Sequence, residues 1–256
     1  MTPISRRSPP SGNRRRDSHR GQRPPVRRPY PWHGPGPGPF PNYLTAAEVA
    51  AIFAAARADT SRVGLRNYLL LGTSYFYGLR AGEPGLILRS QLDLDGGTVR
   101  IERLKGGLGH RYLLYPELAD PFRRYLAERP LPSGAPDPLP ADADFLFPST
   151  NLVYLPGEAP RVVGLSPRSV HSLLLDYAEE AGVLANYQDR PGYVRAHALR
   201  HSIATHMLNA GCDLIYVQYQ LGLVSPHSVE RYAWFTDVRM DARMRKLRRH
   251  RAIAKV

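Results

Sequence analysis

Cysteine is almost absent from this sequence, and the single Cys212 excludes two classes of small protein. One thiol cannot close an intramolecular disulfide or supply a cysteine-rich zinc site, so neither a disulfide framework nor a zinc finger is expected. No run approaches the roughly 18 apolar residues that a transmembrane helix needs, and no apolar stretch follows the basic N-terminus. We therefore expect a cytoplasmic protein without a membrane span or a secretory signal.

Acidic residues are too few to balance the basic ones, which leaves a formal net charge of +13. The excess lies at the two ends: residues 1–40 hold nine Arg and one Asp, and residues 237–256 hold eight Lys or Arg and two Asp. Basic end segments attract a polyanion without specifying which one, so the charge favours nucleic acid as the partner. Solubility or localisation remains an alternative explanation for the N-terminal segment alone.

The sequence divides into three parts. Residues 1–42 are expected to be a disordered arm, because ten Pro and nine Arg among the first 40 residues leave little that could form a hydrogen-bonded core. Residues 43–240 are expected to form the folded domain, and residues 241–256 a basic C-terminal tail helix with Met244 and Leu247 at helical spacing.

Periodicity within the folded part predicts an α+β domain that is mostly helical. Thr45 and Glu48 are typical of a capping box at the start of the first helix, and Ser166-Pro167 is typical of a later helix start. The expected helices cover residues 46–58, 66–77, 121–128, 167–180, 198–210, 213–221 and 228–235. Tyr216 and Tyr219 are expected to pack on the preceding helix.

One small antiparallel sheet is expected among these helices. Residues 98–104 and 111–115 flank the glycine-rich Gly106-Gly107-Leu108-Gly109, which indicates a hairpin, and Gly96-Gly97 indicates a turn before it.

The residues that could carry chemistry are spread along the domain. His197 and Arg200 stand three apart on a predicted helix, so both can face one site, although this spacing alone is more often structural. Arg80 follows the end of an earlier helix, Lys105 lies in the hairpin, and Tyr232 follows the Leu221-Gly222 turn. No set of His, Cys, Asp and Glu has the spacing of metal ligands, so no metal or other cofactor is expected.

These segments resemble the tyrosine recombinases, the family of the phage integrases. Gly78-Leu-Arg80-Ala-Gly-Glu83 is similar to the first arginine box of that family, and His197-Ala-Leu-Arg200 to its His-x-x-Arg box. Lys105 matches the hairpin lysine, and Tyr232, ten residues after Gly222, matches the spacing to the nucleophile. The likeness covers about residues 43–240, with all boxes in the expected order.

The resemblance implies a fold, a reaction and partners. The domain would be a tyrosine recombinase catalytic domain that cuts and rejoins double-stranded DNA, acting as a homotetramer and passing through a Holliday junction. Arg80 and Arg200 would bind the phosphate oxygens, Lys105 would protonate the leaving 5′ oxygen, His197 would assist proton transfer, and Tyr232 would form a 3′-phosphotyrosine. That covalent link conserves the bond energy, so neither ATP nor a metal would be needed.

In relatives the segment after the nucleophile docks on a neighbouring protomer. The resemblance therefore suggests that the tail is exchanged between protomers; a tail that only contacts DNA is the alternative.

Two features separate this sequence from the usual family pattern. Leu223 stands where the family has His or Trp, and His227 could replace the missing donor only in part. The helical DNA-binding domain that usually precedes the catalytic unit has no counterpart, which resembles the short recombinases that invert fimbrial promoter switches. Arg66-Asn67-Tyr68 and Arg103-Leu-Lys105 are also similar to that subgroup.

Three alternatives stay open at this point. The chain could be a DNA-binding relative that no longer recombines, a type IB topoisomerase with the same Arg, Lys, Arg and Tyr chemistry, or a basic protein that coats nucleic acid.

Overall fold

The computed structural model describes residues 43–104, 106–189 and 192–224. All of them belong to one unit that spans residues 37–256. The expected arm, the expected helix over residues 228–235 and the basic tail lie outside the described residues.

Helix α1 (Ala46–Ala58) begins where the sequence predicts, at a complete capping box. Thr45 Oγ1 accepts the backbone N–H of Glu48 at 3.2 Å, and Glu48 Oε2 accepts the N–H of Thr45 at 2.8 Å. The same carboxylate accepts the Asn186 amide at 2.8 Å and the Tyr187 hydroxyl at 3.0 Å. The start of α1 is therefore joined to a segment far along the chain.

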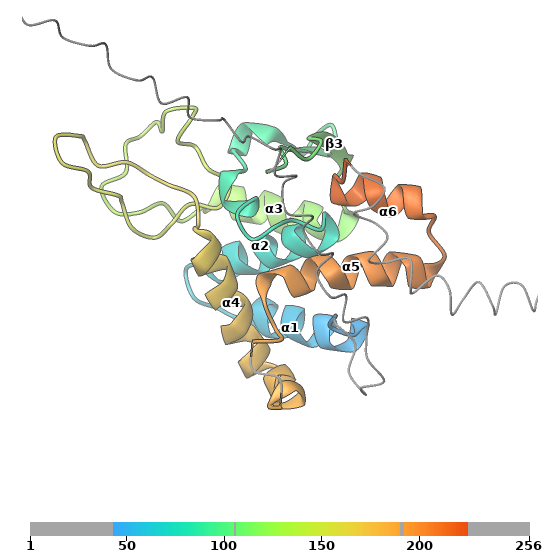
Figure 1. Ribbon diagram of the computed structural model, residues 1–256. Helices are drawn as coiled ribbons and strands as arrows, with labels where there is room; N and C mark the ends of the chain where they lie inside the picture. The colour runs from blue at the N-terminus through green and yellow to red at the C-terminus, as the bar shows by residue number, and fades with distance from the viewer. Residues whose placement is uncertain (1–42, 105, 190–191, 225–256) are drawn as a thin grey trace, which may run out of the picture. The chain divides into compact units, whose positions relative to one another are not determined.

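Helix α2 (Gly64–Phe76) is the central helix of the domain. It packs against four other helices and is buried on almost all sides, as expected for a helix with apolar residues around its circumference. The surrounding helices are α1, α3 (Pro116–Ala127), α4 (Pro167–Glu180) and α5 (Ala196–Ala210) (Figure 1). Because α2 is fixed on these sides, the residues that directly follow it have a defined position.

The start of helix α3 was predicted wrongly. The sequence places it at Pro121, because proline is favoured in the first turn. The helix begins at Pro116, with Tyr115 as its N-cap, and Pro121 lies inside it. The other described helices agree with their predicted ranges to within two residues at each end.

Helix α6 (Leu214–Leu221) packs on α5 through its buried Val217 and Leu221. Its tyrosines do not follow the prediction: Tyr216 is 69% exposed, and Tyr219 packs on the sheet, where its ring lies 4.4 Å from the ring of His110. Helix α6 thus contacts α5 on one side and the hairpin on another.

The sheet has three antiparallel strands in the order β1 (Leu92–Asp93), β2 (Thr98–Ile101) and β3 (His110–Leu113). Ile101 pairs with His110 at the loop end of the β2–β3 hairpin, beside the connecting segment that contains the glycines. The glycine turn before β2 is as predicted, and Gly97 has φ +61°. The domain is mostly helical with one small antiparallel sheet, which confirms the predicted fold class.

Buried Arg66 connects the start of α2 to the loop between α3 and α4. Its guanidinium donates to the carbonyl oxygen of Pro148 at 2.8 Å and to the side-chain oxygen of Asn67 at 2.9 Å.

None of the described helices combines the length and the apolar composition that a membrane crossing requires.

Candidate active site

Arg80 follows the end of α2 and is fixed by Glu83, three residues later. Glu83 Oε2 accepts the backbone N–H of Arg80 at 2.9 Å, and Oε1 accepts Nη1 at 2.8 Å. Nη1 also lies 3.3 Å from the carbonyl oxygen of Leu104. Nε and Nη2 make no hydrogen bond to the described residues, and the side chain is 20% exposed. The guanidinium is therefore fixed at Nη1 and retains donors for a ligand.

Glu83 is a buried carboxylate between two arginines. Its other ion pair is with Arg103, whose Nη1 lies 3.0 Å from Oε2, and both of these side chains are fully buried. Burial alone raises the pKa of the Glu83 carboxyl, but the Arg80 amide and the charge of Arg103 outweigh burial and hold that pKa below its usual value. Glu83 is therefore a stable anion at neutral pH.

Arg200 comes from α5 and is only 5% exposed. Its Nη1 donates to the carbonyl oxygen of Gly78, and its Nη2 donates to the carbonyl oxygen of Leu221 at 3.0 Å. Gly78 stands two residues before Arg80, and Leu221 ends α6. Arg200 thus contacts the segment that carries Arg80, so the structure brings the two predicted arginines into one region.

Glycines allow the three backbone segments around these arginines to approach closely. A Cβ atom on Gly78, which has φ +56°, would lie 2.3 Å from Leu221 Cδ2. A Cβ on Gly107 would lie 2.9 Å from the carbonyl oxygen of Gly222 and 3.4 Å from Arg80 Nη1. The hairpin, the end of α2 and the end of α6 therefore meet in a space without room for side chains at these positions.

The remaining three predicted residues are placed only in part. His197 lies in the first turn of α5, one turn before Arg200, and is exposed. Lys105 and Tyr232 lie outside the described residues. The carbonyl of Leu104, the residue before Lys105, contacts Arg80.

Leu223, at the position where the sequence departs from the family pattern, is partly buried. It packs against the cluster formed by Ile203, Leu208 and Leu221 on α5 and α6. Its backbone is also fixed, because its N–H donates to the Gln218 carbonyl at 3.0 Å. An apolar side chain therefore fills this position by packing.

Arg103 is the residue of this site to which the sequence pattern assigned no role. Its Nη2 donates to the carbonyl oxygens of Tyr77 at 2.7 Å and Gln220 at 2.6 Å, and to the Tyr112 hydroxyl at 2.9 Å. A signal was available: Val99 and Ile101 point into the core, and the same alternation places residue 103 on the inner side.

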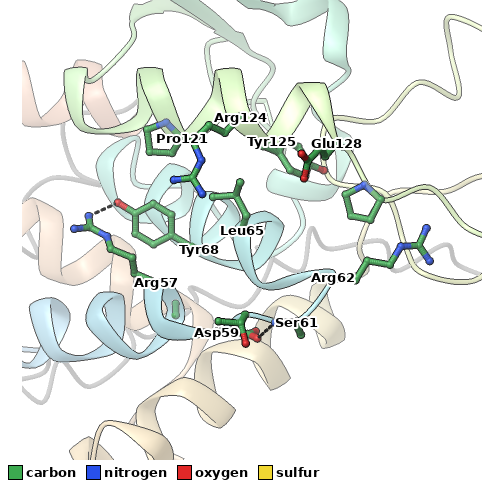
Figure 2. A pocket seen from close by; sticks show the side chains of 13 residues that line it. Arg57, Asp59, Ser61, Arg62, Leu65, Tyr68, Pro121, Arg124, Tyr125 and Glu128 are labelled. Atoms are coloured by element: carbon green, nitrogen blue, oxygen red, sulfur yellow. Dashed lines mark hydrogen bonds between the residues drawn. The ribbon is translucent and has the colours of Figure 1, made fainter.

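A cavity of about 480 Å³ lies elsewhere, between the end of α1, the start of α2 and α3 (Figure 2). Arg57 donates to the Tyr68 hydroxyl there at 2.7 Å, and Asp59 accepts the Ser61 amide at 2.8 Å and the Tyr177 hydroxyl at 2.5 Å. None of the predicted site residues lines it. Within the described part of the chain, no group of His, Cys, Asp and Glu is arranged to hold a metal ion.

A mostly helical domain with a three-stranded sheet, in which Arg200 contacts the segment that carries Arg80, has the architecture of a tyrosine recombinase catalytic domain. The chain belongs to the phage integrase family, whose model matches residues 42–238. Tyrosine recombinase XerD of Caulobacter vibrioides is 36% identical over 186 residues, which cover 72% of this chain and 54% of that protein. Tyrosine recombinase XerC of Staphylococcus saprophyticus is 30% identical over 199 residues, with coverages of 77% and 58%.

Solved structures show the same similarity. The XerH site-specific recombinase in a post-cleavage complex with palindromic difH substrate is 25% identical, with a TM-score of 0.60 over 79% of this chain and 52% of XerH. XerA recombinase, at 24% identity, supports the fold alone, with a TM-score of 0.57 over 77% of this chain and 60% of XerA. The chain spans little more than half the length of the XerD and XerC relatives.

Proposed function

We propose that this chain is a site-specific recombinase that cleaves and rejoins double-stranded DNA through a 3′-phosphotyrosine on Tyr232. The observation that carries the proposal is the hydrogen bond from Arg200 to the Gly78 carbonyl, which fixes Arg200 beside the segment that carries Arg80. Membership of the phage integrase family supports it, as does the likeness to XerH, whose structure is a post-cleavage complex with DNA.

The two arginines suit a phosphodiester under attack. Negative charge builds on the nonbridging oxygens as the nucleophile approaches, so catalysis depends on positioning and electrostatic stabilisation. A guanidinium is permanently charged and planar, and it can donate two parallel hydrogen bonds to such oxygens. Arg80, whose Nε and Nη2 make no hydrogen bond to the described residues, is the donor that a phosphate reaches in this arrangement.

Proton transfer is assigned to the other predicted residues. Lys105 protonates the leaving 5′ oxygen, because an ammonium can release a proton whereas a guanidinium cannot. His197 assists removal of the proton from the Tyr232 hydroxyl, whose reference pKa is about 10. Positive charge from the arginines lowers the cost of forming the phenolate.

The DNA-bound assembly is part of the proposal. Four copies would hold two duplexes and exchange strands in turn through a Holliday junction, with residues 241–256 docking on a neighbouring protomer. Deleting residues 241–256 is then expected to weaken assembly on DNA, measured by analytical ultracentrifugation of the complex. Unchanged assembly would leave those residues as a DNA-contacting tail.

The cellular setting is also inferred. A DNA strand-exchange protein acts where the chromosome is, so we place this chain in the cytoplasm. Inversion of a promoter switch, as in the fimbrial recombinases, is supported by the likeness of Arg66-Asn67-Tyr68 and Arg103-Leu-Lys105 to that subgroup. The XerC and XerD relatives favour a more general site-specific reaction.

Covalent trapping tests the reaction with DNA of many sequences at once, so the target site need not be chosen beforehand. A pool of duplexes with a randomised core and one nick is incubated with the protein, and DNA that remains attached after denaturation is sequenced. We expect an adduct with the wild-type chain and none with Tyr232→Phe, which removes only the hydroxyl. A wild-type chain that binds the pool and yields no adduct would favour the DNA-binding relative, a function motivated by Leu223.

Two further outcomes identify the remaining alternatives. Adducts without a shared sequence, together with relaxation of supercoiled plasmid, would indicate a topoisomerase. DNA binding unaffected by Arg200→Ala, without any adduct, would indicate a coating protein.

A further inference from the structure

We propose that Arg103 is a positioning residue for strand cleavage. Its positive charge neutralises the Glu83 carboxylate, so that the positive charge of Arg80 stays available for the DNA phosphate. This inference rests on the proposed function. Arg103 itself is not a phosphate ligand, because its side chain has no exposed surface.

The charges around Glu83 explain the role. One carboxylate contacts two guanidinium groups, Arg80 through Oε1 and Arg103 through Oε2. This group of three side chains carries one net positive charge. Arg80 is the member with exposed surface and with donors that make no hydrogen bond to the described residues, so the surplus charge faces the site. Without Arg103, Glu83 and Arg80 would form a neutral pair.

Arg103 also fixes the three segments that the reaction needs together. It lies on the hairpin, and its Nη2 donates to the Tyr77 carbonyl at the end of α2 and the Gln220 carbonyl at the end of α6. The backbone of Gly222 also packs closely on Arg103, because a Cβ atom on Gly222 would lie only 2.7 Å from Arg103 Nε. One guanidinium therefore joins the segments that lead to Arg80, Lys105 and Tyr232.

A contribution to stability alone does not account for a charge at this position. Arg103 Nε is buried and has no hydrogen-bond partner among the described residues, which costs free energy. Replacing a whole buried ion pair with apolar residues of similar volume is often neutral or stabilising, so packing and stability do not by themselves call for ionised groups here. The charge of Arg103, rather than its volume, is what Arg80 and Glu83 require.

The salt dependence of DNA binding tests the charge sharing without requiring catalysis. The probe is a duplex of random sequence, and affinity is measured by fluorescence anisotropy across a range of salt concentrations. Arg80→Ala should lower the slope of log K against log salt by about 1, the value of one phosphate contact. Arg103→Met should lower the slope by a similar amount, although the replaced side chain cannot touch DNA.

A second substitution separates electrostatics from folding. Glu83→Gln removes the charge that neutralises Arg80 and retains an oxygen that accepts from it. In the Arg103→Met background, Glu83→Gln should therefore restore the salt slope toward wild type. It should also recover part of a roughly 10²-fold loss in the rate of adduct formation on the nicked DNA recovered by trapping.

Arg66→Met is the matched control, because Arg66 is also a buried arginine that donates to a backbone carbonyl, but it lies at the other end of α2. It should lower the melting temperature while leaving the salt slope unchanged. If Arg103→Met does not fold, Arg103→Lys replaces it: the lysine keeps the charge, so the slope should stay at the wild-type value.

The outcomes distinguish this inference from the proposed function. A wild-type slope in Arg103→Met, a lowered slope in Arg103→Lys, or no recovery on adding Glu83→Gln would overturn the role of Arg103 even if the wild-type chain forms adducts. A salt slope that follows the expected pattern in a protein that never forms an adduct would support the charge sharing and refute the cleavage reaction.

Discussion

The guanidinium of Arg200 donates a hydrogen bond to the carbonyl oxygen of Gly78, although 122 positions separate the two residues. Gly78 ends the turn after α2 that leads to Arg80, and Arg200 lies within α5. This contact makes the relative position of the two arginines a property of the folded core. Each substitution at Arg200 is therefore expected to have two effects, one on the proposed phosphate site and one on the packing of α2 against α5.

Arg200→Ala should therefore reduce both activity and stability. Two buried carbonyl oxygens, of Gly78 and Leu221, would lose their donor, which typically costs about 1–3 kcal/mol for each buried group left unsatisfied. The rate of adduct formation should fall by about 10²–10³, as for the loss of one donor in the transition state. Urea denaturation and single-turnover trapping measure the two effects. Arg195→Ala, an exposed arginine at the start of the same helix, is the control and should change neither by a comparable amount.

Gly222→Ala should destabilise the domain more than Gly97→Ala. The two glycines have nearly the same positive φ, +59° and +61°, so the backbone strain of a side chain is similar at both. A Cβ on Gly97 would meet no atom within 4 Å, whereas one on Gly222 would come within 2.7 Å of Arg103 Nε and 2.9 Å of the Leu108 carbonyl oxygen. We expect an additional loss of about 1–3 kcal/mol at position 222. If urea denaturation gives equal losses in the free energy of unfolding for both variants, the end of α6 and the hairpin can move apart without cost.

Leu223→His should accelerate strand cleavage. Leucine fills the position by packing on the Ile203 cluster but offers no hydrogen-bond donor. A histidine there could donate to the phosphate, and one such donor is worth up to about 10²-fold in rate. Leu223→Met keeps the apolar packing and serves as the control. Equal single-turnover rates for the histidine and methionine variants would show that this position does not reach the phosphate.

The stability of the domain should decrease below neutral pH through His206. Burial lowers the pKa of His206, and the nearby backbone of Leu44 offsets only part of this effect. The unfolded chain therefore binds a proton at a higher pH than the folded chain does. Stability is complete above the unfolded pKa, near 6.5, and is lost as the pH falls toward the folded value.

His206→Gln should reduce this decrease, because glutamine can accept from the Tyr75 hydroxyl, now 2.8 Å from His206 Nδ1, and does not titrate. The free energy of unfolding, compared between about pH 7 and pH 5, provides the measurement. His171→Gln, a change on α4, is the comparison. A decrease with pH that is identical in His206→Gln and the wild type would assign the effect to other groups.

The fold was largely predictable because its helices carry local signals. Thr45 with Glu48 and Ser166 with Pro167 mark the starts of α1 and α4 correctly, since capping depends on residues within the first turn of the helix. Pro121 misled the prediction because proline is favoured in the first turn of a helix, whereas α3 begins five residues earlier, at Pro116, and keeps Pro121 inside it. The exposure of Tyr216 depends on which side of α6 packs on α5. That side is set by contacts with Ile203 and Leu208 on α5, which local sequence patterns do not reveal.

The sequence indicates which residues could form the candidate site but not the contacts that support them. The spacing of the boxes singles out Arg80 and Arg200, and Arg200 contacts the segment that carries Arg80. Their roles stay predictions. Lys105 and Tyr232 lie outside the described residues, so their assignments remain predictions. Arg103 was missed because its partners, Glu83, Tyr77 and Gln220, lie up to 117 positions away.

The carboxylate of Glu48 has a consequence for how the chain matures. It closes the first turn of α1 locally, yet it also accepts hydrogen bonds from Asn186 and Tyr187, which leave the ribosome more than a hundred residues later. Contacts between such distant positions slow folding, because the chain must close a long loop before it gains them. The first helix can therefore form early during synthesis, but these contacts anchor it only after α2, the sheet, α3 and α4 have been made.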